Sequence, residues 1–137
     1  MKYWLVKSEP STWSWSDQVG ARTAEWDGVR NHQAKLNLQA MARGDKAFFY
    51  HSGLDKQIVG IVKVVKTYYP DPTDPTGRFG MVDFQAVRPM KSPVDLARIR
   101  ADERLKDMLL LRHTRLSVQP VDAAFWRIVC RMGGVVK

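Results

Sequence analysis

Apolar residues fall into five short runs along the chain, and each run has the composition of a β-strand. The runs cover residues 3–7, 47–50, 58–65, 80–88 and 115–119. The third run is nearly continuous in β-branched residues, which predicts a strand covered on both faces. Gly60 inside it predicts a bend or bulge, and Pro120 is expected to end the last strand because proline cannot donate to a sheet.

Helical periodicity occurs between these runs. One apolar face predicts a helix over about 32–43, with Gly44 as its C-terminal stop. Ser14 and Asp17 have the spacing of a capping box, which predicts a short helix after the first strand. Three later helices are expected, one opened by Ser92-Pro93-Val94-Asp95, one over about 102–110 and one closed by Gly133-Gly134.

The order of the predicted elements limits the fold class. Strands and helices do not alternate regularly, which disfavours a doubly wound α/β sheet. Three prolines within residues 69–77 predict an exposed loop. We therefore expect an α+β fold in which a twisted mixed sheet of about five or six strands closes into a β-barrel with flanking helices. The length of 137 residues fits a single domain over 1–137.

The charge of the chain favours an anionic partner. Lys and Arg number 22 against 14 Asp and Glu, which gives a net charge of +8 and a pI of about 9.9. The two halves of the chain share this excess equally, so a folded basic surface is expected instead of a basic tail. Nucleic acid is the partner class that such a surface suits best.

Several kinds of site are excluded or disfavoured. Cys130 is the single cysteine, so an internal disulfide and a Cys-pair zinc motif are excluded. His32, His51 and His113 are far apart and form no His-x-x-x-His pair, so no metal is expected. No Gly-rich phosphate loop occurs, so no cofactor is expected. A signal peptide and an apolar span of roughly 20 residues are both missing, so we expect a soluble, cytoplasmic protein.

Polar residues gather where the predicted strands and helices begin and end. The segments that carry them are Lys7-Ser8-Glu9-Pro10, Trp26 to Asn31, Tyr50-His51-Ser52 and Arg115 to Ser117. Side chains at such ends are presented by a rigid scaffold. The set contains an aromatic ring, an amide, hydroxyls and cations, which are the groups that a pocket for a planar nucleobase needs.

Structural roles remain open for the same residues. A tryptophan beside a turn usually packs against the protein, which is an alternative role for Trp26. Asn31 could cap the helix that follows it, and His51 could satisfy a backbone group near a strand end. Glu9 could neutralise Lys7 or a nearby arginine. Packing is also the expected role of three other tryptophans, Trp13, Trp15 and Trp126.

At these loops the chain resembles the EVE domain. The resemblance rests on six blocks that run in family order over about nine tenths of the chain, which makes it far more specific than a lone motif. The blocks are Tyr3-Trp4-Leu5-Val6-Lys7-Ser8-Glu9-Pro10, Trp26-Asp27-Gly28-Val29-Arg30-Asn31, Gly44-Asp45 with Phe49-Tyr50-His51-Ser52, Val59-Gly60-Ile61-Val62, Tyr69-Pro70-Asp71-Pro72 and Arg115-Leu116-Ser117-Val118-Gln119-Pro120.

The resemblance implies a PUA-like fold, related to the YTH, ASCH and SRA-type domains. It also implies a non-catalytic module that reads a modified base in nucleic acid, in particular a modified cytosine in DNA. Carried over by motif position, the base pocket would consist of nine residues: Ser8, Glu9, Trp26, Arg30, Asn31, His51, Ser52, Arg115 and Ser117.

The resemblance also suggests roles for these residues. Trp26 would stack on the base or close the pocket, while Asn31, Ser8 and Ser117 would read its polar edges. Two cations, Arg30 and Arg115, would meet phosphate or brace the pocket through Glu9. Two other functions remain open, namely an RNA-binding module of the PUA or YTH kind and an ASCH-like enzyme acting on a nucleotide-type substrate. In the enzyme, Glu9 or His51 would be the general acid or base.

Overall fold

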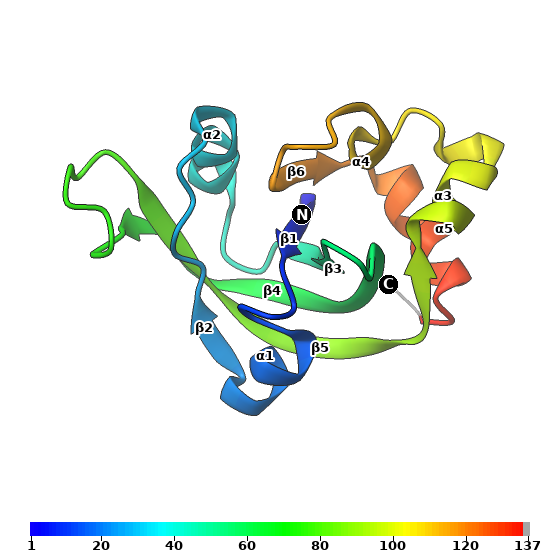
Figure 1. The fold of residues 1–137 in the computed structure, drawn as a ribbon, viewed down its shortest axis with the longest axis horizontal. Coiled ribbons are helices and arrows are strands. Elements are labelled where there is room, and N and C mark those ends of the chain that lie inside the picture. Colours follow the sequence, from blue (N-terminus) through cyan, green and yellow to red (C-terminus); the bar gives the residue numbers. More distant parts are fainter. Residues whose placement is uncertain (136–137) are drawn as a thin grey trace.

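The structure, a computed structural model, describes residues 1–135. It contains one six-stranded sheet with helices against both faces (Figure 1). The strands are β1 (Tyr3–Ser8), β2 (Thr23–Glu25), β3 (Lys46–His51), β4 (Gln57–Pro70), β5 (Gly80–Asp95) and β6 (Val118–Val121). The helices are α1 (Trp15–Ala21), α2 (His32–Ala40), α3 (Leu96–Ala101), the 3₁₀ helix η1 (Glu103–Leu105), α4 (Leu109–Arg112) and α5 (Ala123–Met132).

The sheet is mixed, with strand order β2-β5-β4-β3-β1-β6. Only the β1–β3 pair is parallel among the described strands, and the other four pairs are antiparallel. The hydrogen-bonded ladder leaves β2 and β6 at its two edges. The expected α+β fold with a mixed sheet and flanking helices is therefore confirmed, while the sheet curves without closing into a hydrogen-bonded barrel.

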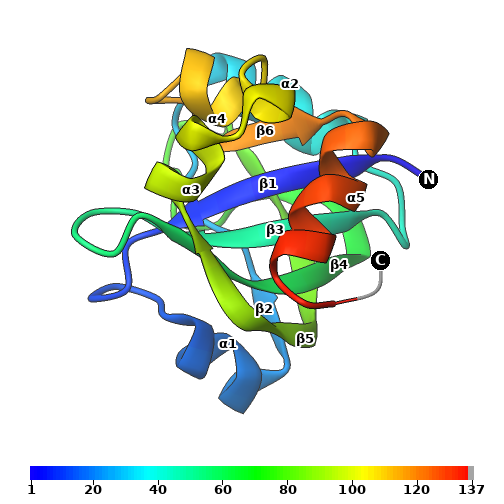
Figure 2. The same cartoon turned by 90° about the vertical axis from the view of Figure 1, so that its right-hand side faces the viewer.

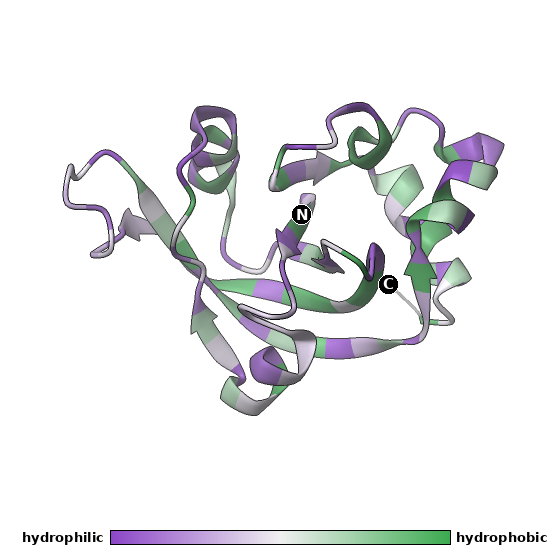
Figure 3. Cartoon of the chain, in the orientation of Figure 1, coloured by the Kyte–Doolittle hydropathy of each residue, from purple (hydrophilic) through white to green (hydrophobic). Residues whose placement is uncertain are grey.

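Alternation along the central strands divides the core into two parts. Successive strand residues point to opposite faces, so Phe49 packs in one cluster while Phe48 packs in the other. The first cluster lies beneath α2 and the second beneath α3, α4 and α5. The helices α3 and α5 lie at the right of Figure 1, and Figure 2 shows α5 crossing the strands β1, β3 and β4. Figure 3 shows hydrophobic residues concentrated on the central strands, whereas the loop between β4 and β5 is hydrophilic. The prediction that the 58–65 strand is covered on both faces is confirmed.

The predicted irregularity at Gly60 is also confirmed. The pairing of β4 with β5 shifts register between Ile58 and Gly60. A Cβ at this position would lie 2.5 Å from the Trp15 ring, which therefore needs a glycine beneath it. The bulge thus seats the start of α1 directly on the sheet.

The helix predictions are only partly correct. The capping box is confirmed, because Asp17 N donates to Ser14 Oγ and Ser14 N donates to the Asp17 carboxylate. The 32–43 helix ends earlier, since the Met41 backbone is extended and caps α2 after Ala40. The 102–110 segment is broken into η1 and α4. The final helix is confirmed, with Gly133 at its C-cap.

Long-range pairing overrides two other local signals. Segment 92–95 was expected to open a helix but belongs to β5, where Val94 pairs with Ile58 and Asp95 caps α3. Pro120 does not end the last strand, because it lies inside β6 at the edge of the sheet, where proline is tolerated. Residues 115–117 precede that strand instead of forming it.

The loop after β4 differs from its prediction. Tyr69 and Pro70 still belong to β4, and the loop that follows them holds two buried carboxylates, Asp71 and Asp74. Each accepts hydrogen bonds from backbone and threonine groups within the loop. Side-chain bonds thus order a segment that lacks regular structure. No helix among residues 1–135 is both long enough and apolar enough to cross a membrane.

Candidate functional site

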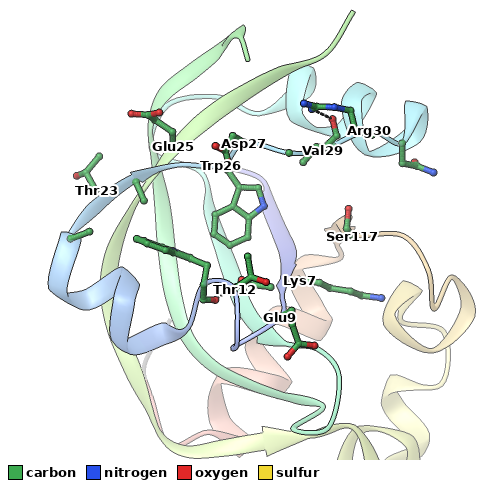
Figure 4. A pocket seen from close by; sticks show the side chains of 16 residues that line it. Lys7, Glu9, Thr12, Thr23, Glu25, Trp26, Asp27, Val29, Arg30 and Ser117 are labelled. Carbon is green, nitrogen blue, oxygen red and sulfur yellow. Dashed lines mark hydrogen bonds between the residues drawn. The ribbon is translucent and has the colours of Figure 1, made fainter. Parts of the chain in front are cut away.

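A pocket of about 670 Å³ opens at one side of the sheet, where four segments distant in sequence meet. It is formed by the end of β1 with the loop that follows, by the α1–β2 connection, by the loop from β2 to α2, and by the residue preceding β6 (Figure 4). Its volume lies within the range of roughly 300–1,000 Å³ that small-molecule sites occupy. The pocket is therefore large enough to take a heterocycle together with its sugar.

Six of the nine predicted pocket residues line this pocket and three do not. Those that line it are Ser8, Glu9, Trp26, Arg30, Asn31 and Ser117. Those outside it are His51, Ser52 and Arg115. Trp26 and Asn31 thus meet at one pocket, together with residues more than 80 positions away along the chain.

Trp26 forms the rear wall of the pocket. It is 8% exposed and packs edge-to-face against Phe49 at 5.6 Å and Phe84 at 5.4 Å between ring centroids. No hydrogen bond is made by its indole nitrogen among the described residues, although that atom is not sealed in the core. Figure 4 shows the nitrogen directed toward the side of the pocket that holds Ser117 and Lys7. The packing role proposed for Trp26 is real, and the ring still offers the pocket a free donor.

Asn31 likewise combines a structural position with a place at the pocket. Its Oδ1 accepts a hydrogen bond from Ala34 N at 2.9 Å, which makes it the N-cap of α2. The capping alternative is therefore confirmed. The bond occupies the amide oxygen and leaves the amide nitrogen of this exposed side chain without a bond to the described residues.

Arg30 is held by the loop between β4 and β5 and not by Glu9. Its guanidinium lies 3.1 Å from the Asp71 carboxylate and donates to Thr73 Oγ1 at 2.9 Å. Asp71 also accepts from Gly28 N at 2.8 Å, so one buried carboxylate fastens the pocket loop at two points. The predicted brace through Glu9 is wrong in this respect, because the partner of Arg30 is Asp71.

The environment of Asp71 favours its charged form. Burial alone raises the pKa of this carboxyl, but hydrogen bonds from Thr73, Gly28 and Arg30 outweigh it and lower the pKa from 3.8 to about 2. The carboxylate is therefore ionised at neutral pH. Its negative charge is matched by Arg30, and the loop from β2 to α2 is fixed.

Ser8, at the end of β1, and Glu9, in the loop that follows, both line the pocket. The Glu9 carboxylate accepts weak bonds from Ser11 N and Oγ at 3.5 and 3.4 Å, and its other oxygen lies against the backbone of Gly53. Ser8 donates its hydroxyl hydrogen to the carbonyl oxygen of Trp13. Lys7 does not pair with Glu9, because its ammonium donates to Thr114 O at 2.7 Å.

His51 supports the scaffold behind the pocket. Its Nε2 accepts a hydrogen bond from Trp15 N at 2.9 Å, while Nδ1 lies 3.1 Å from an Asp55 carboxylate oxygen. Both ring nitrogens are thus engaged, and the alternative that His51 satisfies a backbone group is confirmed. Arg115 is exposed and does not line the pocket, although it is only two residues from Ser117.

Several lining residues were not predicted. Trp13, assigned to packing by its sequence context, forms part of the wall, and its indole donates to Gln18 Oε1 at 2.9 Å. Lys7 lines the opposite side, where burial lowers the pKa of its ammonium group. Other lining residues come from the short strand β2 and its neighbours, among them Thr23, Glu25 and Asp27. Lys7 belongs to the sequence block Lys7-Ser8-Glu9, which was a signal for its place at the pocket. The strand β2 has three residues and is too short to leave a periodic signal, so the sequence did not predict its lining residues.

Metal-binding chemistry has no evident place here. Within residues 1–135, no group of three or more His, Cys, Asp or Glu side chains is arranged to hold a metal ion. Cys130 is buried in the second core cluster. The pocket offers hydrogen-bond donors and acceptors around aromatic walls, an arrangement suited to recognition of a planar polar ligand.

Comparison with known proteins places the chain in a family. The sequence profile of the EVE domain matches residues 2–132. Thymocyte nuclear protein 1 from Mus musculus is 39% identical over 153 aligned positions, which cover 87% of this chain and 68% of that protein.

Two solved structures are similar along the whole chain. The NMR structure of Rpa0253 from Rhodopseudomonas palustris is 55% identical with a TM-score of 0.93, covering 100% of this chain and 96% of that one. The crystal structure of human THYN1 in complex with DNA containing 5-methylcytosine is 34% identical with a TM-score of 0.91, and the match covers 100% of both chains. The expected PUA-like fold is confirmed by this likeness. The chain belongs to the EVE domain family.

Proposed function

We propose that this protein binds DNA that carries a modified cytosine and holds that base in the pocket around Trp26, without catalysing a reaction. The observation that carries the proposal is the pocket itself, where Trp26, Asn31 and Ser117 meet from distant parts of the chain. The human relative in complex with DNA containing 5-methylcytosine supports the ligand class.

The walls of the pocket suit a single base. Two indole rings, Trp13 and Trp26, supply apolar surface for stacking or edge contact, which contributes about 1–3 kcal/mol per base. The unpaired donor of the Trp26 indole and the hydroxyl of Ser117 are available to polar atoms at the base edge. A base removed from the duplex stack would recover part of the unstacking cost, a few kcal/mol, through these contacts.

The carboxylates of the pocket favour cytosine over thymine. Glu9, Glu25 and Asp27 all line it, and a carboxylate accepts hydrogen bonds but cannot donate them when ionised. Cytosine presents an amino donor where thymine presents a carbonyl acceptor, so an acidic wall selects the former. The cations Lys7 and Arg30 stand at the same pocket and suit the flanking phosphates.

A binding titration tests this proposal. Single-stranded and duplex oligonucleotides would carry one central 5-methylcytosine, 5-hydroxymethylcytosine, cytosine or thymine. We expect a modified cytosine to bind more tightly than cytosine by about fourfold or more, the effect of one buried methyl group at roughly 0.8 kcal/mol. Thymine should bind more weakly than either. Equal affinities for all four bases would contradict the proposal.

The remaining candidate functions are outcomes of the same experiment. Tighter binding of a matched RNA would indicate an RNA-binding module, because the 2′-hydroxyl is the group that distinguishes the two ligands. Conversion of the bound nucleotide would indicate an enzyme. In that case Glu9→Gln should abolish turnover while the ligand still binds, since Glu9 is a pocket carboxylate that could exchange a proton.

A further inference from the structure

Leu54 is fully solvent-exposed, at 100% relative exposure, on the hairpin that joins β3 to β4. Single exposed apolar residues are common on protein surfaces and need no explanation by themselves. The position of this one is unusual because the hairpin of residues 52–56 adjoins the pocket. Figure 2 shows the hairpin projecting from the molecule at the left, beside the loop that follows β1.

Two contacts tie the hairpin to residues that line the pocket. Ser52 N donates to Ser8 O at 2.9 Å, and Ser8 lines the pocket. Gly53 has a φ of +76°, and a Cβ at this position would clash with Glu9 Oε2, so the glycine backbone lies directly against a lining carboxylate. Consecutive Cα atoms are about 3.8 Å apart, so Leu54 starts one residue beyond that contact. Figure 4 shows Glu9 directed toward this hairpin.

The hairpin is also held from its other side. Lys56 has a φ of +47°, an uncommon value for a residue with a side chain, and its carbonyl accepts from Leu96 N at 2.8 Å. Asp55 pairs with His51 at 3.1 Å. Anchors on both sides of Leu54 therefore present an apolar side chain to solvent from a fixed backbone, which reduces the ordering cost of a later contact.

We propose that Leu54 is a wedge that enters the DNA base stack beside the modified cytosine when that base moves into the pocket. This inference rests on the proposed function. A base leaving the duplex opens a gap between its neighbours, and proteins that unstack a base step commonly insert an apolar side chain such as leucine. Leu54 follows Gly53, whose backbone lies against the lining carboxylate of Glu9, and its side chain is fully exposed in the free protein. Lys56, two residues further along the same hairpin, adds a positive charge that suits DNA phosphates.

The test compares Leu54→Ser with a matched control, Leu36→Ser. Leu36 is the other strongly exposed leucine, at 56%, and lies on α2 outside the pocket. Affinity is measured for a single strand and for a duplex that carry the same central 5-methylcytosine. The base next to it is 2-aminopurine, whose fluorescence rises when it is unstacked. Thermal unfolding of each variant verifies that the fold is intact.

Leu54→Ser should weaken duplex binding by about tenfold, since an apolar contact of leucine size is lost, and should remove the fluorescence rise. Its single-strand affinity should stay within about twofold of the wild type, because an unpaired base needs no wedge. Leu36→Ser should change neither affinity, and Leu54→Met should retain duplex binding. Unchanged duplex binding in Leu54→Ser, or an equal loss on both ligands, would overturn the wedge alone. Failure of the wild type to bind either modified ligand would overturn the proposed function and the wedge with it.

Discussion

At the scale of single residues, Asp71 connects the loop between β4 and β5 to the pocket loop that runs from β2 to α2. Its buried carboxylate accepts from Gly28 N and pairs with Arg30, so both bonds fix the loop that carries Trp26. Replacement by asparagine keeps the shape but removes the charge. We expect Asp71→Asn to lower the free energy of unfolding at pH 7 by about 1–3 kcal/mol, measured by urea denaturation. Asp107→Asn, which alters an exposed ion pair, should cost less than about 1 kcal/mol.

The same carboxylate makes stability depend on pH. Because the pKa of Asp71 is lowered from 3.8 to about 2 on folding, its contribution is fully present above the unfolded value. It is lost progressively as pH falls from about 4 through 2, and amounts to roughly 2 kcal/mol. Denaturation curves across this window should show a shallower decline for Asp71→Asn than for the wild type. Parallel declines would contradict the assignment.

Trp26 offers a test in which packing and recognition are separated. Trp26→Phe retains an aromatic ring between Phe49 and Phe84 but removes the free indole donor. We expect it to weaken binding of modified DNA by about tenfold while the protein stays folded. The matched control is Trp15→Phe, since Trp15 packs on Phe49 outside the pocket. Comparable losses in both variants would show that the effect comes from packing.

At the scale of elements, a buried glutamine fastens α1 to the sheet. Gln18 is fully buried, accepts from the Trp13 indole, and donates to Arg22 O and Phe84 O. Gln18→Ala removes the hydrogen bonds to the Trp13 indole, Arg22 O and Phe84 O and leaves a small cavity. We expect a loss of about 2–4 kcal/mol in stability together with weaker ligand binding, because Trp13 lines the pocket. Gln39→Ala, on the exposed side of α2, should change neither quantity beyond about 0.5 kcal/mol.

The elements that could be predicted are those with a local cause. The β-branched run of β4, the capping box of α1 and the glycine stop of α5 each act within a few residues. Segments 23–25 and 92–95 could not be predicted, because their strand geometry comes from pairing with partners up to about 60 positions away. Which strands a segment pairs with depends on the tertiary fold, so the local amino-acid sequence does not predict it.

The contrast between local signals and long-range structure also explains which pocket residues were predicted correctly. The sequence blocks identified whole loops, and Ser8, Glu9 and Trp26 on those loops line the pocket. The blocks did not determine the direction in which each side chain points. His51 lies on the same side of β3 as Phe49 because side chains alternate along a strand. There, behind the pocket wall, its Nε2 accepts a hydrogen bond from Trp15 N. Arg115 precedes β6 in a loop that turns it to solvent. The orientation of a side chain depends on twist, bulges and turns that a motif does not encode.

At the scale of the whole molecule, we expect the net charge of +8 to supply the phosphate contacts and the pocket around Trp26 to supply the base contacts. The base contacts of the pocket depend little on ionic strength, whereas phosphate contacts release counterions. With about four phosphate contacts, affinity for modified DNA should fall roughly 150-fold between 50 and 200 mM salt. The affinity for the free modified deoxycytidine nucleoside, which has no phosphate, should stay nearly constant. Weak salt dependence for the DNA would mean that the basic surface does not face the strand, and that the pocket alone supplies the affinity.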